Sequence, residues 1–287
     1  MRSAHKKPTR TKIRSIIGHI LSQIAMIIVA AAFILPVLIV VGYSFKTKKE
    51  LYVGSPLALP HHFDWSNYAY AIYRLNIGTS FFNTLLYTSV SVFALAILAG
   101  AASWAIARNR GKFFKFSYIY FIVGILIPYQ ALFLPIYVVG YTLHLTNTAY
   151  GVILMYIATG MSFSVFLMTS FMSTVPVELE EAARIDGSSL YRTFFSIVVP
   201  LLRPAMATLI IMESFLIWND YLMASLYVST GGLRTLTVAI QSLFSQQTND
   251  YTSAMAAIVI AVLPIAILFI VLQRYFVKGM TVGAVKG

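Results

Sequence analysis

Six long runs of apolar residues constrain the fold of this 287-residue chain, at about positions 16–45, 79–107, 116–141, 150–172, 205–228 and 251–276. Each reaches the roughly 20 residues that an α-helix needs to cross about 30 Å of hydrocarbon, whereas the strands of a membrane barrel alternate polar and apolar residues over about ten. The chain is 59% hydrophobic and only 10% charged, against roughly 45–50% and 25% in soluble domains. The sequence therefore predicts an all-α polytopic membrane protein with six transmembrane helices.

Basic residues indicate how these helices are oriented. If the amino terminus is cytoplasmic, 16 of the 21 Lys and Arg residues lie in cytoplasmic segments, as the positive-inside rule requires. Both termini are then cytoplasmic. The five exceptions are Lys46, Lys48, Lys49, Arg74 and Arg234. For the three lysines, which directly follow the first run, the sequence suggests nothing beyond snorkelling to the membrane interface.

We expect the chain to divide into a basic tail (1–15), a first transmembrane helix (16–45), an extracytoplasmic loop (46–78), a core with five spans (79–276) and a second tail (277–287). The first run is too long for the core of a signal peptide and continues past its small residues. It predicts a retained anchor helix that is bent near Pro36.

The segment 176–204 is a polar island between the fourth and fifth runs, with the sequence PVELEEAARIDGSSLYRTFFSIVVPLLRP. It predicts two short helices joined by a hinge. Pro176 suits the first turn of the first helix, and Gly187 ends that helix because glycine adopts a left-handed conformation without strain. Ser188 is expected to cap the second helix, which Pro200 and Pro204 close.

Acidic residues are concentrated in this loop, which holds four of the nine in the chain: Glu178, Glu180, Glu181 and Asp186. The other segments predicted to be cytoplasmic contain none. Apolar residues fall near one face of the predicted helices, namely Leu179, Ala182, Ala183 and Leu190. A small apolar surface flanked by carboxylates on a basic side of the membrane favours docking to a partner. The alternative is a solvated amphipathic hairpin without a partner.

The loop also carries a family resemblance. The pattern resembles the cytoplasmic "EAA" loop of binding-protein-dependent ABC import permeases, which ends I-x-L-P. It consists here of Glu181-Ala182-Ala183, three residues, Gly187, nine residues and then IVVP at 197–200. Val199 stands where leucine is usual. The run ELEEAARIDG, with Asp186 before the glycine, is similar to the carbohydrate-uptake branch and to the maltose-type second permease in particular. Further matches, including IPYQALFLPIY at 127–137, extend the resemblance over about 79–287.

This resemblance implies the ABC importer permease fold, with a coupling helix that docks on an ATPase through Glu178, Glu181, Ala182, Ala183, Asp186, Gly187 and Pro200. It implies a bacterial inner-membrane subunit that pairs with a second, non-identical permease, two ATPase subunits and an extracytoplasmic sugar-binding protein. The sugar and membrane lipid are its other expected partners. ATP and Mg²⁺ are expected on the ATPase, so this chain needs no cofactor of its own.

Polar residues within the spans are candidates for the transport path, because a carboxylate in the membrane is costly unless it faces a cavity or a partner. They are Gln130, Glu213, Trp218, Asn219 and Asp220. Two alternatives stay open from the sequence. Trp218 and Asp220 can be an interfacial aromatic anchor and its solvated neighbour, and Glu213 can make a structural hydrogen bond to another helix.

Other functions find less support in the sequence. The chain has no G-x-x-x-x-G-K-[ST] loop for nucleotide phosphates, no cysteine and no H-E-x-x-H motif, which disfavours an ATPase or a membrane-embedded enzyme. His61, His62 and Asp64 are too few ligands for a metal site and predict an ordered outer loop. The net charge of +12 lies beside the spans and does not form a nucleic-acid-binding domain. An ion-coupled secondary transporter that uses Glu213 and Asp220 is the alternative function.

Overall fold

A computed structural model describes residues 10–55, 57–228, 231–244 and 250–284, and this part of the chain contains helices and no strand. Four of its helices are long and apolar enough to cross a membrane: α1 (Arg10–Ser44), α4 (Ile77–Arg108), α7 (Ala149–Met172) and α14 (Tyr251–Ala284). Two bent pairs of helices also have the required length and composition. Counting each pair as one span gives six, in agreement with the prediction of an all-α, six-span protein.

The first bent pair is the predicted third span. Helix α5 (Lys112–Leu126) is followed by the 3-10 turn η1 (Tyr129–Leu132) and by α6 (Phe133–Thr142), at an angle of 97°. The bend falls at Ile127, whose backbone is extended with φ −75° and ψ 120°. A proline disfavours the helical conformation in the residue before it, and Pro128 therefore accounts for the break.

The second bent pair leads out of the polar loop. Helix α9 (Leu190–Thr193), the π-helical segment η2 (Phe194–Val198) and α10 (Val199–Leu201) form one run, which meets α11 (Arg203–Asn219) at an angle of 76°. Pro204 lies in the first turn of α11, just after the run ends at Leu201, whereas Pro200 lies inside the run and does not close it, contrary to the prediction. The run tolerates Pro200 because it widens to π geometry just before, where the backbone N–H of Val199 donates to the Phe194 carbonyl.

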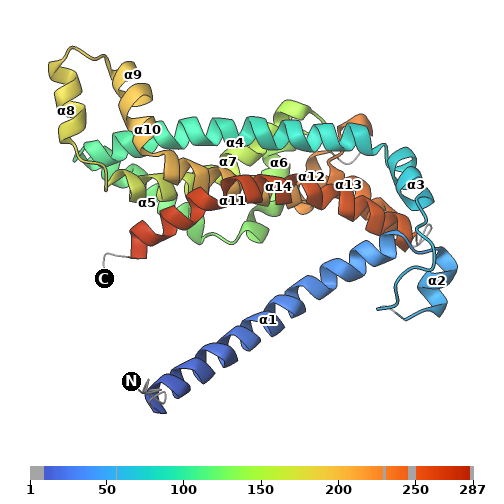
Figure 1. Ribbon diagram of the computed structural model, residues 1–287. Helices are drawn as coiled ribbons and strands as arrows, with labels where there is room; N and C mark the ends of the chain where they lie inside the picture. Colours follow the sequence, from blue (N-terminus) through green and yellow to red (C-terminus); the bar gives the residue numbers. More distant parts are fainter. Residues whose placement is uncertain (1–9, 56, 229–230, 245–249, 285–287) are drawn as a thin grey trace, which may run out of the picture.

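Helices α4, α7 and α11 form the centre of the bundle. Their buried side chains include Leu95, Val152, Met168 and Leu209, and the longest packed interface is the one between α4 and α7. Helix α1, the blue helix in Figure 1, lies apart from the bundle over most of its length and meets α14. It continues through Pro36 without interruption.

Short helices occupy the end of the bundle opposite to the polar loop. These are α2 (Lys48–Val53), α3 (Ser66–Arg74) and α13 (Leu236–Gln241), whereas α8 (Glu178–Ile185) and α9 lie at the other end together with the last turns of α14 (Figure 1). The remaining short elements are α12 (Leu222–Tyr227), η3 (Gly231–Leu233) and η4 (Ser242–Phe244). The two ends of the bundle are thus built from different parts of the chain.

The structure gives roles to two of the three lysines that follow α1. The side chain of Lys46 is 2% exposed, and its Nζ donates to the Ser55 carbonyl over 3.1 Å and lies 4.5 Å from the centre of the Tyr43 ring. Lys48 pairs with Asp250 at 3.5 Å. Lys46 therefore makes a contact within the loop at 46–78, and Lys48 joins this loop to the start of α14, instead of only snorkelling.

The predicted order of the loop at 46–78 has a local cause as well. Thr47 and Glu50 form a capping box at the start of α2, and a carboxylate oxygen of Glu50 accepts the backbone N–H of His61 over 3.1 Å. These hydrogen bonds to Thr47 and His61 hold the pKa of Glu50 below its usual range.

The orientation in the membrane can be tested with single cysteines, since the native chain has none. Cysteines at Ser55 and Thr146 are expected to react with an impermeant thiol reagent added outside the cell, whereas cysteines at Asn109 and Ser188 react only after permeabilisation. Ser3 and Thr230, which serve the same test, lie outside the described residues. Labelling of Ser188→Cys from outside would reverse the predicted topology.

Candidate coupling loop and membrane cavity

The polar loop extends from one end of the bundle as two arms, with α8 as the first and α9 as the start of the second (Figure 1). Most of α8 is open to its surroundings: Glu178, Glu181, Ala182 and Asp186 are all exposed. Ile185 and Tyr191, on the two arms, are 86% and 81% exposed. The loop therefore exposes carboxylates, as the sequence predicted, together with two large apolar side chains that the sequence did not single out.

The face of α8 that turns toward the bundle differs from the predicted one. Ala183 is 8% exposed and Glu180 is 4% exposed. Residues three apart lie on the same face of a helix, so Glu180 and Ala183 share the face of α8 that points toward the bundle. Ala183 is therefore the one member of the predicted apolar surface that is buried, whereas Ala182, Leu179 and Leu190 are exposed, the two leucines at 44% and 64%.

The turn between the two arms is a Schellman motif. The backbone N–H of Ser188 donates to the Ala183 carbonyl over 2.9 Å, and that of Gly187 to the Arg184 carbonyl over 3.1 Å. Gly187 has φ +78°, as this motif requires of the residue after the helix end. Ser189, and not the predicted Ser188, caps α9, because its hydroxyl accepts the N–H of Arg192, whereas Ser188 is used by the motif.

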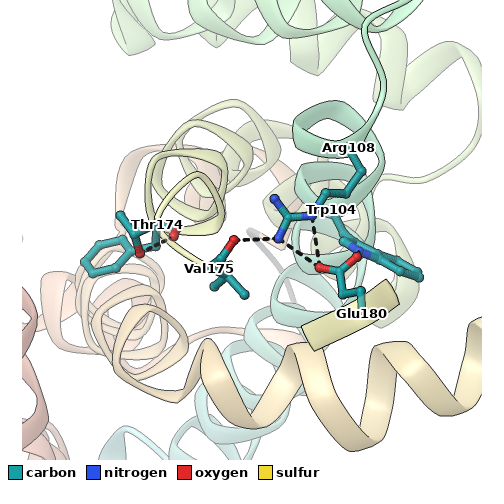
Figure 2. A network of polar contacts seen from close by, with 6 residues as sticks. Trp104, Arg108, Thr174, Val175 and Glu180 are labelled. Atoms are coloured by element: carbon teal, nitrogen blue, oxygen red, sulfur yellow. Dashed lines mark hydrogen bonds and ion pairs between the residues drawn. The ribbon is translucent and has the colours of Figure 1, made fainter. Parts of the chain in front are cut away.

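Glu180 is the centre of a polar network beneath α8, which Figure 2 shows from close by. Its Oε1 accepts from Arg108 Nε at 2.9 Å and pairs with Nη2 at 2.8 Å, and its Oε2 accepts from Trp104 Nε1 at 2.8 Å. Arg108 Nη2 also donates to the Val175 carbonyl over 2.8 Å. Glu180 is one of the four acids of the loop, and the sequence alone does not distinguish its inward carboxylate from those of its exposed neighbours.

A cavity of about 460 Å³ lies among the spans. Three of the predicted path residues line it, Glu213, Asn219 and Asp220, together with aromatic side chains that the sequence did not single out: Tyr129, Tyr156, Phe163 and Phe215. An isolated tyrosine in an apolar run carries little information in the sequence, because only the packing of the helices brings Tyr129 and Tyr156 to the same cavity.

The two carboxylates of the cavity are held differently. Glu213 is 2% exposed and its Oε1 accepts from the Ser164 hydroxyl over 3.0 Å. Asp220 accepts from the Tyr156 hydroxyl and from the Ala224 N–H, both at 2.9 Å. Asp220 directly follows the last residue of α11, Asn219, and α12 begins at Leu222, so the predicted span to 228 is divided at this point.

The other two predicted path residues do not line this cavity. Trp218 is 5% exposed, and its Nε1 donates to the Ala261 carbonyl of α14 over 3.0 Å, so the alternative of an exposed interfacial anchor does not hold. Gln130 is exposed beside the bend at Pro128, and its neighbour Tyr129 reaches the cavity instead.

Six candidate spans, an exposed acidic loop at one end and a polar and aromatic cavity between spans define a polytopic helical membrane protein built for transport. The model of the family described as "Binding-protein-dependent transport system inner membrane component" matches residues 93–282, and the chain belongs to this family. The family predicted from the sequence is thereby confirmed.

Relatives match nearly the whole chain. The probable starch degradation products transport system permease protein AmyC of Thermoanaerobacterium thermosulfurigenes is 37% identical over 91% of this chain and 94% of its own length. The melibiose/raffinose/stachyose import permease protein MelC of Bacillus subtilis is 36% identical over the same shares. In fold, the chain is similar to a chain of a bacterial ABC transporter involved in alginate import, with a TM-score of 0.80, 21% identity, and coverage of 94% of this chain and 99% of that one.

Proposed function

We propose that this chain is the translocating permease subunit of an ATP-driven importer for an oligosaccharide, which an extracytoplasmic sugar-binding protein delivers. Two relatives that match 91% of the chain are named as permeases for starch degradation products and for melibiose, raffinose and stachyose. In this arrangement both termini and the loop at 176–204 face the cytoplasm, and the outer loop at 46–78 faces the binding protein.

The observation that carries the sugar assignment is the composition of the cavity. Rings of Tyr129, Tyr156 and Phe163 lie beside Glu213, Asn219 and Asp220. Sugars present apolar ring faces that pack on aromatic side chains and hydroxyl groups that donate to carboxylates and amides. A volume of about 460 Å³ falls in the range of roughly 300–1,000 Å³ typical of small-molecule sites. The cavity suits part of an oligosaccharide, with the rest of its path supplied by a second permease.

The source of energy lies on other subunits in this proposal. The sequence has no loop for nucleotide phosphates, and the exposed surface of α8 supplies a docking element for one of two ATPase subunits, which bind ATP and Mg²⁺. Closure of the ATPases would pull on α8 and tilt the spans joined to it, opening the cavity to alternate sides of the membrane.

Purification of the chain from native membranes tests this assignment. We expect it to bring along a second permease and an ATPase, identified by mass spectrometry. The reconstituted complex should import labelled oligosaccharide only when ATP and the binding protein are both supplied. Uptake by this chain alone, driven by an ion gradient, would contradict the proposal and favour the secondary transporter.

A further inference from the structure

Glu180 is buried and fully hydrogen-bonded, unlike the exposed acids of the same loop. Both of its carboxylate oxygens accept hydrogen bonds from α4, from Arg108 and from Trp104, at 2.8–2.9 Å, and the side chain is 4% exposed. A buried ion pair is weak evidence for stability, since desolvation offsets much of the attraction, but its geometry is specific and removing one partner is strongly unfavourable. The network therefore fixes the position of α8 against the end of α4.

Arg108 joins three segments at once. Its guanidinium belongs to the last residue of α4, pairs with Glu180 on α8, and donates to the Val175 carbonyl in the connection from α7 to α8 (Figure 2). The planar guanidinium presents its donors in a rigid fork that fixes the directions of both acceptors, whereas the ammonium of lysine is a point charge on a flexible stem. Arg108 thus holds the first arm of the loop to α4 at two points, at Val175 before α8 begins and at Glu180 within α8.

Trp104 extends the same connection to the second arm. While its Nε1 donates to Glu180, its ring stacks on Phe194, with 5.5 Å between ring centres and an interplanar angle of 30°. Phe194 is the first residue of the π-helical segment that leads toward α11, and it is buried. Both arms of the loop therefore contact a single side chain of α4.

We propose that Trp104, Arg108 and Glu180 form a latch that makes the coupling loop and α4 move as one unit, with Glu180 as its positioning residue. This inference rests on the proposed coupling function of the loop. The chain itself connects the loop to α7 on one side and to α11 on the other. Helix α4 is distant in sequence and contacts the loop through its side chains. Since α4 packs on both α7 and α11, the latch lets a displacement of α8 reach all three central spans together.

The test uses the assembled importer with its ATPase, binding protein and labelled oligosaccharide. Glu180→Gln and Arg108→Gln are expected to leave the subunits assembled but to raise the ATP hydrolysed per sugar imported by about tenfold, the factor that corresponds to loss of one charge-assisted hydrogen bond. The double variant should be no worse than either single one, because the two residues act as a pair. Arg110→Gln, which removes the same charge at an exposed position, is the matched control and should leave the ratio unchanged.

Trp104→Phe supplies a milder variant, because it removes the indole N–H but keeps a ring against Phe194, and it remains informative if the charge variants fail to assemble. We expect an intermediate rise in the same ratio. A lower yield of assembled importer, with unchanged ATP hydrolysis per sugar imported in all variants, would show a purely structural role and overturn the latch. If Gly187→Val disrupts coupling while these variants do not, the latch alone is wrong; if none of them affects coupling, the proposed role of the loop fails with it.

Discussion

Gly187→Val is expected to abolish most sugar uptake while leaving membrane insertion and pairing with the second permease intact. Gly187 has φ +78° and an added Cβ would meet no atom within 4 Å, so the effect is conformational and not steric. A residue with a Cβ is destabilised there by about 1–2 kcal/mol, and a β-branched one is affected most. The Schellman turn would open and re-aim the second arm, which weakens ATPase docking by about tenfold or more.

Gly187→Asn is the matched control, because asparagine tolerates the left-handed conformation far better than valine. Uptake and sugar-stimulated ATP hydrolysis should fall little with asparagine and strongly with valine. Glu181→Lys, which changes an exposed carboxylate of α8, should reproduce the valine phenotype through charge. Full uptake by Gly187→Val, with the ATPase bound normally, would remove the loop from the coupling mechanism.

Glu213→Gln is expected to reduce uptake by about tenfold without loss of assembly. The amide keeps the shape of the side chain and can still accept from the Ser164 hydroxyl, which lies 3.0 Å from the carboxylate. What it removes is the charge that a sugar hydroxyl would meet in the cavity, and a charge-assisted hydrogen bond is worth about 1.5–3 kcal/mol. The measurement is initial uptake rate against sugar concentration in vesicles of the reconstituted complex.

Two controls accompany this variant. Glu213→Asp keeps the charge on a shorter side chain, and a partial recovery relative to Glu213→Gln would attribute the effect to charge. Proton flux measured in the same vesicles separates the two transport classes, since only an ion-coupled transporter loses a coupled proton current. Unchanged uptake by Glu213→Gln would leave Glu213 with the structural hydrogen bond to α7 alone.

Much of this protein could be predicted from its sequence, because the membrane restricts the choice of structure. Backbone groups in hydrocarbon must be satisfied within the segment, so an apolar run of sufficient length specifies a helix regardless of its neighbours. Gly187 was equally predictable, since its role depends on its own backbone conformation. These features are local, and the family pattern around Glu181 is read directly along the chain.

Tertiary structure decided which polar side chains meet. Glu178, Glu180 and Glu181 are the same residue type within four positions, yet only Glu180 turns inward. Its partners, Trp104 and Arg108, lie on a helix more than seventy positions earlier in the chain. Glu213 and Tyr156 line one cavity while Trp218, on the same helix as Glu213, contacts α14. Such outcomes depend on how helices pack against one another, and packing is set by contacts between distant segments that local periodicity does not encode.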